Sequence, residues 1–165
     1  MSKAIITEVT GNIFNYLENG DYLLHQVNCQ GVMGAGIAKT IKEEMPDVFY
    51  RYKLYVDSYG GMTSLLGSCQ TCMTKWNGIS ITVCNLFGQD NFGRTGDRFT
   101  DYDALEQAMK IALWSSRSNT RFVIPMFIGC GYGGGNWDTV MDIIERVFVN
   151  RSVLLVRYDE SPINK

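Results

Sequence analysis

The sequence has few of the residues that hold metals. It contains one histidine, His25, and five cysteines, an odd number. Because no secretion signal accompanies them, the cysteines are expected to be reduced thiols. Cys69 and Cys72 form a single C-x-x-C motif, but a structural zinc site needs further ligands, and the sequence has no second pair. The flanking residues are typical of a strand, in which positions three apart face opposite sides. The sequence therefore predicts no metal site, and nothing in it indicates a cofactor.

Long apolar runs and clusters of like charge are also missing. No stretch approaches the roughly 20 apolar residues of a membrane span, and the opening MSKAIITEVT lacks the apolar core of a signal peptide. The formal net charge is −2, and the basic residues form no run. We therefore expect a cytoplasmic, monomeric protein with no membrane segment and no broad nucleic-acid surface. This charge still allows the protein to bind one anionic ligand through backbone amides.

Strand and helix patterns alternate along the 165 residues, a length that suits one domain. A turn is expected over 58–63, and the turn 75–78 joins two strands into a hairpin. Interleaved elements with one hairpin predict an α/β fold with a mixed central sheet covered by helices on both faces. The expected strands are 3–9, 21–28, 64–73, 79–87, 121–127 and 151–158, and the expected helices are 36–45, 48–56, 101–117 and 137–148.

Two glycine-rich segments each follow a buried strand and precede a helix. The first, residues 31–36, has three glycines, and the second, residues 129–135, has five. In open α/β sheets ligands bind beyond the carboxyl ends of the strands. A helix N-terminus presents free N–H groups there, and glycine lets a ligand approach the backbone. Two such segments facing each other predict a diphosphate site without a lysine. The alternative interpretation is that these glycines only form tight turns and bind no ligand.

Two familiar phosphate-binding motifs do not fit. The pattern G-x-x-x-x-G-K-[ST] is absent, which excludes a P-loop nucleotidase. GAGIAK approaches the dinucleotide motif G-x-G-x-x-G, but Lys39 occupies the third glycine position. A Rossmann-type dinucleotide oxidoreductase is therefore only a remote alternative.

The segments VNCQGVMGAGIAKTI and IPMFIGCGYGGGNWDTV, in this order and at this separation, resemble the macrodomain family, which binds ADP-ribose. TEVTGNIF resembles the family's first-strand signature T-G-D-I, and the resemblance extends from Thr10 to Tyr158. It implies that residues 1–165 form a single macrodomain with a three-layer α/β/α fold. The most similar branch includes terminal ADP-ribose protein glycohydrolases, ADP-ribose 1''-phosphate phosphatases and DNA-ADP-ribose glycohydrolase antitoxins. The segment 85–105 suggests a microbial or phage member.

The resemblance also implies which residues form the site. Asn28 would hydrogen-bond the distal ribose, or it would cap the strand end. Tyr132 would cover that ribose or anchor its loop, and Tyr158 would stack on adenine or only end its strand. The ligand-binding residues implied are Asn12, Ile13, Asn28, Met33, Gly34, Ala35, Gly36, Ile37, Gln89, Gly129, Cys130, Gly131, Tyr132, Gly133 and Tyr158.

The sequence departs from the family pattern at two places. Asn12 replaces the aspartate of T-G-D-I; its amide can still accept a hydrogen bond from the adenine amino group and donate one to the ring nitrogen, without charge assistance. The glycohydrolase lysine after the middle strand is missing, with Gln89 or Arg94 nearest, and the glycohydrolase aspartate aligns with Gly133. The lysine–aspartate mechanism therefore does not transfer.

Hydrolysis would need other groups near the distal ribose. Asn28, Asp90 and Arg94 are the candidate catalytic residues, with Asp90 as a base and Arg94 as a bidentate ligand of a terminal phosphate. The alternative for the last two is a solvated loop. His25 is expected to be a core histidine, and Cys29 and Cys130 to be packing residues. The prediction is a protein that binds ADP-ribose, or an ADP-ribosylated macromolecule, and hydrolyses an ADP-ribosyl linkage or ADP-ribose 1''-phosphate. A non-catalytic ADP-ribose reader module is the alternative.

Overall fold

A twisted mixed sheet lies at the centre of the computed structural model, which describes residues 2–59 and 64–165. Within these residues the sheet has six strands in the order β1-β6-β5-β2-β4-β3. Neighbouring strands are parallel except for the β3–β4 hairpin. This confirms the predicted mixed sheet, and its strand order differs from that of dinucleotide-binding folds. The strands are β1 (Ile5–Gly11), β2 (Tyr22–Val27), β3 (Cys69–Trp76), β4 (Ile79–Phe87), β5 (Arg121–Pro125) and β6 (Ser152–Tyr158).

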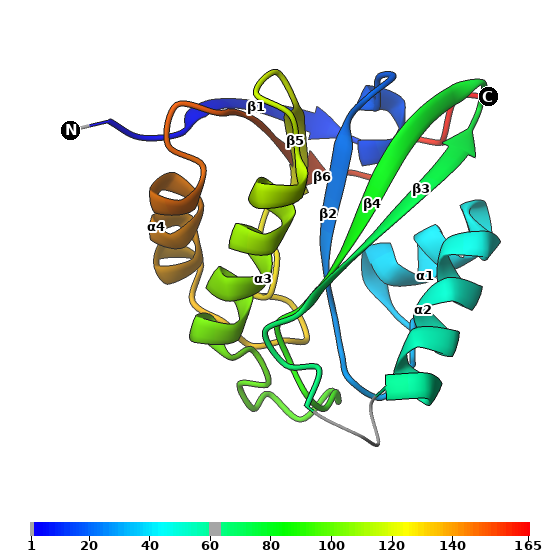
Figure 1. Ribbon diagram of the computed structural model, residues 1–165, viewed down its shortest axis with the longest axis vertical. Coiled ribbons are helices and arrows are strands. Elements are labelled where there is room, and N and C mark those ends of the chain that lie inside the picture. The colour runs from blue at the N-terminus through cyan, green and yellow to red at the C-terminus, as the bar shows by residue number, and fades with distance from the viewer. Residues whose placement is uncertain (1, 60–63) are drawn as a thin grey trace.

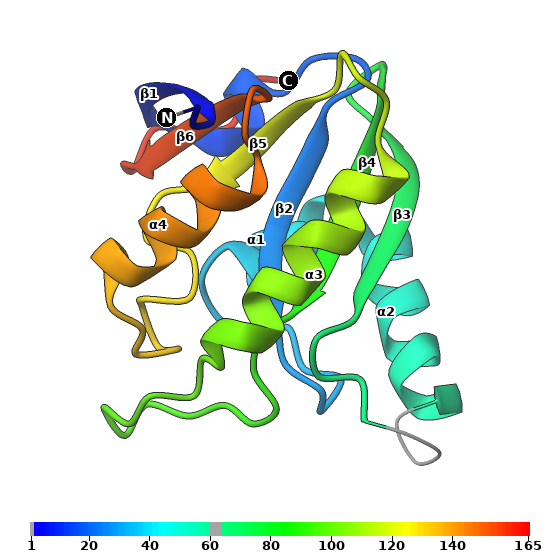
Figure 2. The ribbon, with the colours of Figure 1, turned by 60° about the vertical axis from the view of Figure 1, so that its left-hand side comes forward.

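Helices cover both faces of the sheet, as expected for three α/β/α layers (Figures 1 and 2). α1 (Gly36–Glu44) and α2 (Pro46–Tyr59) lie on one face, and α3 (Tyr102–Ser115) and α4 (Trp137–Val147) lie on the other. A short 3-10 helix, η1 (Ile13–Tyr16), follows β1. Neighbouring residues of β2 pack into separate cores: Leu23 into the cluster that includes Ile41 of α1, and Leu24 into the cluster that includes Leu105 of α3. No described helix is long and apolar enough to cross a membrane.

Several element boundaries differ from those expected. β3 begins at Cys69 rather than at 64, because the chain first turns at Gly67, whose φ is +90°. α2 begins earlier, at Pro46, a residue suited to a first helical turn. β5 ends at Pro125, two residues early, because Phe127 has a φ of +67°. The turn expected over 58–63 does not begin at 58, since α2 continues to Tyr59, and residues 60–63 lie outside the described part of the chain.

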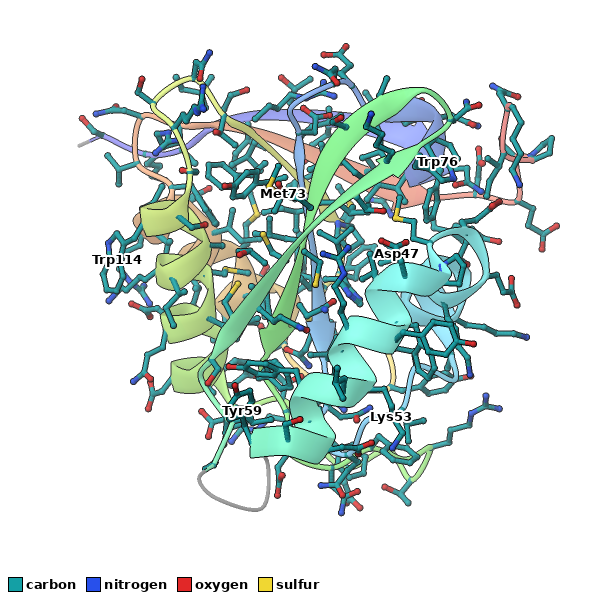
Figure 3. The ribbon with its side chains drawn as sticks, turned by 45° about the vertical axis from the view of Figure 1, so that its right-hand side comes forward. Asp47, Lys53, Tyr59, Met73, Trp76 and Trp114 are labelled. Atoms are coloured by element: carbon teal, nitrogen blue, oxygen red, sulfur yellow. The ribbon has the colours of Figure 1, made fainter. Side chains whose placement is uncertain are left out.

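α2 covers the outer edge of the sheet (Figure 3). The Arg51 guanidinium donates to the Met73 carbonyl at 2.7 Å, and Thr74 Oγ1 donates to the Asp47 carboxylate at 2.8 Å. The Arg51 side chain thus occupies a backbone carbonyl that an edge strand otherwise leaves open to pairing with another chain. A cavity opens elsewhere, at the carboxyl ends of the parallel strands.

Candidate functional site

A cavity of about 780 Å³ opens beyond the carboxyl ends of the parallel strands. Its volume lies within the ~300–1,000 Å³ typical of small-molecule sites. Both glycine-rich segments form part of its wall, together with residues that follow β1, β2, β4 and β5 and the last residue of β6. Of the residues expected at the site, the wall contains Asn12, Ile13, Asn28, Gly34, Ala35, Gly36, Ile37, Gln89, Arg94, Gly129, Gly131, Tyr132, Gly133 and Tyr158.

Three of the expected site residues are not part of this wall. Met33 is 2% exposed and its side chain packs in the cluster formed with Tyr52 and Phe87, so it belongs to the core. Cys130 packs against the cluster beneath α3 and α4. Asp90 is exposed, and its carboxylate accepts from the Gln30 side-chain amide at 3.4 Å. The position expected to supply a base therefore lies beside the cavity rather than in it.

The N-terminus of α1 reaches the cavity without a side-chain cap. Ala35 is its N-cap residue, and no acidic residue stands in the first turn. Elsewhere, α3 and α4 are capped by Asp101 and Asn136. The backbone N–H groups of residues 34–38 donate to no acceptor among the described residues. An uncapped helix start with several unpaired donors has the geometry that binds anions in other proteins.

The second glycine-rich segment presents further donors to the same cavity. The N–H groups of Gly131, Tyr132 and Gly133 have no acceptor within the described chain. The Gly133 carbonyl accepts from Phe99 and Thr100, which fastens the loop 88–101 to this segment. A Cβ added to Gly133 would lie 2.6 Å from Thr100 Oγ1, so close packing alone requires this glycine.

Gly34 and Gly131 stand apart from the other glycines. Neither has a φ in the left-handed region, and a Cβ would meet only Val32 Cγ1 at 3.5 Å for Gly34 and nothing within 4 Å for Gly131. Every other glycine in the described ranges either has a positive φ or would place a Cβ within 3.1 Å of another residue. Folding therefore does not require glycine at these two positions, and both line the cavity.

Asn28 fills the capping role that was the alternative to ribose binding. Its Nδ2 donates to the Val32 carbonyl at 2.8 Å, and its Oδ1 accepts from the backbone N–H groups of Gln30 and Val32. Tyr52, a residue of α2 that sequence reasoning missed, donates its hydroxyl proton to Asn28, with the backbone carbonyl oxygen at 2.6 Å and Oδ1 at 2.9 Å. These bonds hold the first loop in place and leave one Asn28 N–H for a ligand.

A second missed residue is Gln26, a residue of the cavity wall that links several segments through its side chain. Its Nε2 donates to Gln89 Oε1 at 2.7 Å and to Thr100 Oγ1 at 2.8 Å, and Thr100 in turn donates to the Gly129 carbonyl. Gln26 thus connects β2, the end of β4 and the second glycine-rich segment. The only signal in the sequence was an amide side chain, next to His25, inside a mainly apolar strand.

Arg94 is the one charged side chain among the described residues of the wall. Its guanidinium lies 4.8 Å from the centre of the Tyr132 ring, a cation–π contact. Tyr132 is exposed rather than packed as an anchor. Both side chains line the cavity, so Arg94 brings a positive charge to its wall.

The described wall contains no carboxylate, imidazole or thiol. His25 is buried and bonded through Nε2 to Asn85 at 2.6 Å, and burial lowers its pKa to about 4. Burial also raises the pKa of the Cys29 and Cys130 thiols to about 11, so neither is an activated nucleophile. No group of three metal-binding side chains occurs in the part of the chain that the structure describes.

No family model matches the chain. It is 41% identical over 56 residues to an ADP-ribose 1''-phosphate phosphatase of Ajellomyces capsulatus, a match covering 34% of this chain and 22% of that protein. It is 25% identical over 158 residues to an uncharacterized 17.5 kDa protein of Enterobacteria phage T4, covering 94% of this chain and 97% of that protein. The chain thus spans less than a quarter of the fungal phosphatase.

Solved structures resemble the whole chain. The macrodomain of Mycobacterium tuberculosis DarG superposes with a TM-score of 0.69 at 22% identity, covering 92% of this chain and 97% of that one. Thermosipho africanus DarTG, solved in complex with ADP-ribose, gives a TM-score of 0.70 at 17% identity, covering 98% of this chain and 45% of that one. These likenesses confirm the resemblance expected from the two glycine-rich segments. The chain is therefore a macrodomain in its fold.

Proposed function

We propose that residues 1–165 act as a single, monomeric macrodomain whose cavity binds ADP-ribose. Gly34 and Gly131 support this most directly. Folding does not require glycine at these positions, but a ligand in close contact with the backbone would require it. The adenosine would lie near Asn12, Ile13 and Tyr158, and the distal ribose near Asn28 and Tyr132. Structures with this fold include one solved with ADP-ribose bound.

The diphosphate would lie between the two glycine-rich segments. The unpaired N–H groups of residues 34–38 and 131–133 surround this part of the cavity. A hydrogen bond to a charged group contributes about 1.5–3 kcal/mol. A few such bonds supply the attraction that a lysine provides in other phosphate sites, which agrees with the slightly acidic net charge.

We propose further that the protein hydrolyses ADP-ribose 1''-phosphate. Hydrolysis of a glycosidic bond generally uses two carboxylates, and the described wall has none. Phosphoryl transfer depends mainly on positioning and on stabilisation of charge. Water would attack phosphorus, the bond from phosphorus to the anomeric oxygen would break, and ADP-ribose and inorganic phosphate would leave. Arg94 would bind the phosphoryl oxygens, and a fungal relative carries the name of this activity.

A panel of substrates tests both parts. ADP-ribose binding is measured by calorimetry, and turnover is measured with ADP-ribose 1''-phosphate, ADP-ribosylated protein and ADP-ribosylated DNA in turn. We expect binding in the wild type, phosphate release from the first substrate only, and loss of binding in Gly131→Glu. Binding without any turnover would favour the non-catalytic reader module, and a folded wild type that binds no ADP-ribose would contradict the whole proposal.

A further inference from the structure

We infer that the segment 159–165 after β6 forms part of the nucleobase end of the site: it fixes the orientation of the Asn12 amide and thereby the base that the cavity accepts. The inference rests on the proposed function, because it places adenosine at the Asn12 end. Neither Ser161 nor any other residue of this segment was expected at the site.

Two contacts fix the Asn12 amide from opposite sides. Asn12 Oδ1 accepts from the Phe14 backbone N–H at 3.1 Å, as the N-cap of η1. Asn12 Nδ2 donates to the Ser161 carbonyl at 3.2 Å. Turning the amide over would set Nδ2 against the Phe14 N–H and Oδ1 against the Ser161 oxygen, which opposes donor to donor and acceptor to acceptor. The second N–H and the second lone pair of the amide stay available to a ligand in one spatial order.

The segment is held by contacts that lie away from the cavity. Asn15 of η1 donates to the Pro162 carbonyl at 2.9 Å and accepts from the Asn164 N–H at 2.7 Å. Ile163 packs against the core cluster on the α1 face. Lys165 Nζ lies 2.8 Å from the carboxylate of Glu44, a side chain only 15% exposed. Figure 1 shows the segment, in red, running from β6 toward the β3–β4 hairpin, where Asn77 donates to the Asn164 carbonyl.

This arrangement explains why an amide stands at position 12. A carboxylate there would put an anionic oxygen 3.2 Å from the Ser161 carbonyl oxygen, two acceptors with no proton between them. The amide instead offers an acceptor beside a donor. Adenine presents a complementary amino group and ring nitrogen. Hypoxanthine has the opposite order, a carbonyl oxygen and a ring N–H, so it fits only a reversed amide. A fixed amide therefore selects adenine, whereas an amide free to turn accepts both bases.

The test compares the affinity of the full chain for ADP-ribose with its affinity for the hypoxanthine analogue, inosine diphosphate ribose. Asn15→Ala removes two bonds to the segment without touching the cavity wall, and Ile163→Asp detaches the segment by a second route. Asn19→Ala is the matched control, because Asn19 accepts from the Ser80 N–H and does not contact the segment. Thermal melting shows that each variant is folded.

We expect the wild type and Asn19→Ala to prefer ADP-ribose by roughly tenfold or more, since two mispaired polar groups oppose the analogue. In Asn15→Ala and Ile163→Asp the preference for ADP-ribose should fall to about twofold. In the double variants that combine Asn12→Ala with either change, the preference should be no lower than in Asn12→Ala alone. Unchanged preference in both segment variants, or in Asn12→Ala alone, would overturn the inference. A wild type that binds neither nucleotide would instead contradict the proposed function.

Discussion

Replacing Gly131 by alanine, and separately Gly34, tests whether a ligand is the reason for these glycines. A Cβ at Gly131 has no neighbour within 4 Å, and one at Gly34 makes ordinary contact with Val32. Alanine restricts the unfolded chain, so each variant should be more stable by about 0.4–1 kcal/mol. In a domain of this size, that corresponds to a rise in Tm of about 1–4 °C.

The same methyl group should weaken ligand binding. It occupies the space through which a phosphate oxygen reaches the adjacent N–H groups, and losing one hydrogen bond to a charged group costs about 1.5–3 kcal/mol. Each variant should therefore bind ADP-ribose roughly 10- to 150-fold more weakly. Calorimetry measures the affinity, and thermal melting of the same samples measures the stability. Unchanged affinity in both variants would refute the diphosphate position, and a lower Tm would show that folding does need these glycines.

Three further predictions concern single residues. Arg94→Ala should slow phosphate release from ADP-ribose 1''-phosphate by at least roughly tenfold and leave ADP-ribose binding within about threefold, because only the terminal phosphate needs the guanidinium; equal loss of both would place Arg94 elsewhere. Gly133→Ala should lower the free energy of unfolding by about 1–3 kcal/mol, because its Cβ would lie 2.7 Å from the Gly129 carbonyl oxygen; urea unfolding with unchanged stability would contradict this. Burial lowers the pKa of His25 from 6.5 to about 4, so the unfolded chain binds the proton first as the pH falls. The free energy of unfolding should therefore fall by about 3 kcal/mol as the pH drops from 6.5 to 4. His25→Gln should flatten this pH dependence, and an identical pH profile in the variant would contradict the role of His25.

Local patterns in the sequence predicted the architecture well. Strand and helix periodicity depends on neighbours along the chain, so the alternating elements, the β3–β4 hairpin and the N-cap Asn136 all follow from the sequence alone. Boundaries were less accurate at Phe127, since its left-handed backbone has no signature in the sequence. The two glycine-rich segments were placed correctly because the carboxyl ends of parallel strands meet at one edge.

The sequence by itself determined the layers of the fold and the two segments that line the cavity, because these follow from spacing along the chain. Only the tertiary structure decided what each polar side chain does. It directed Asn28 toward its own loop, left Asp90 outside the wall, and brought Gln26 and Ser161 to positions that no motif marks. The reason is physical: a hydrogen bond depends on a partner that is distant in sequence and on direction in space, and neither is encoded in the periodicity of a single segment.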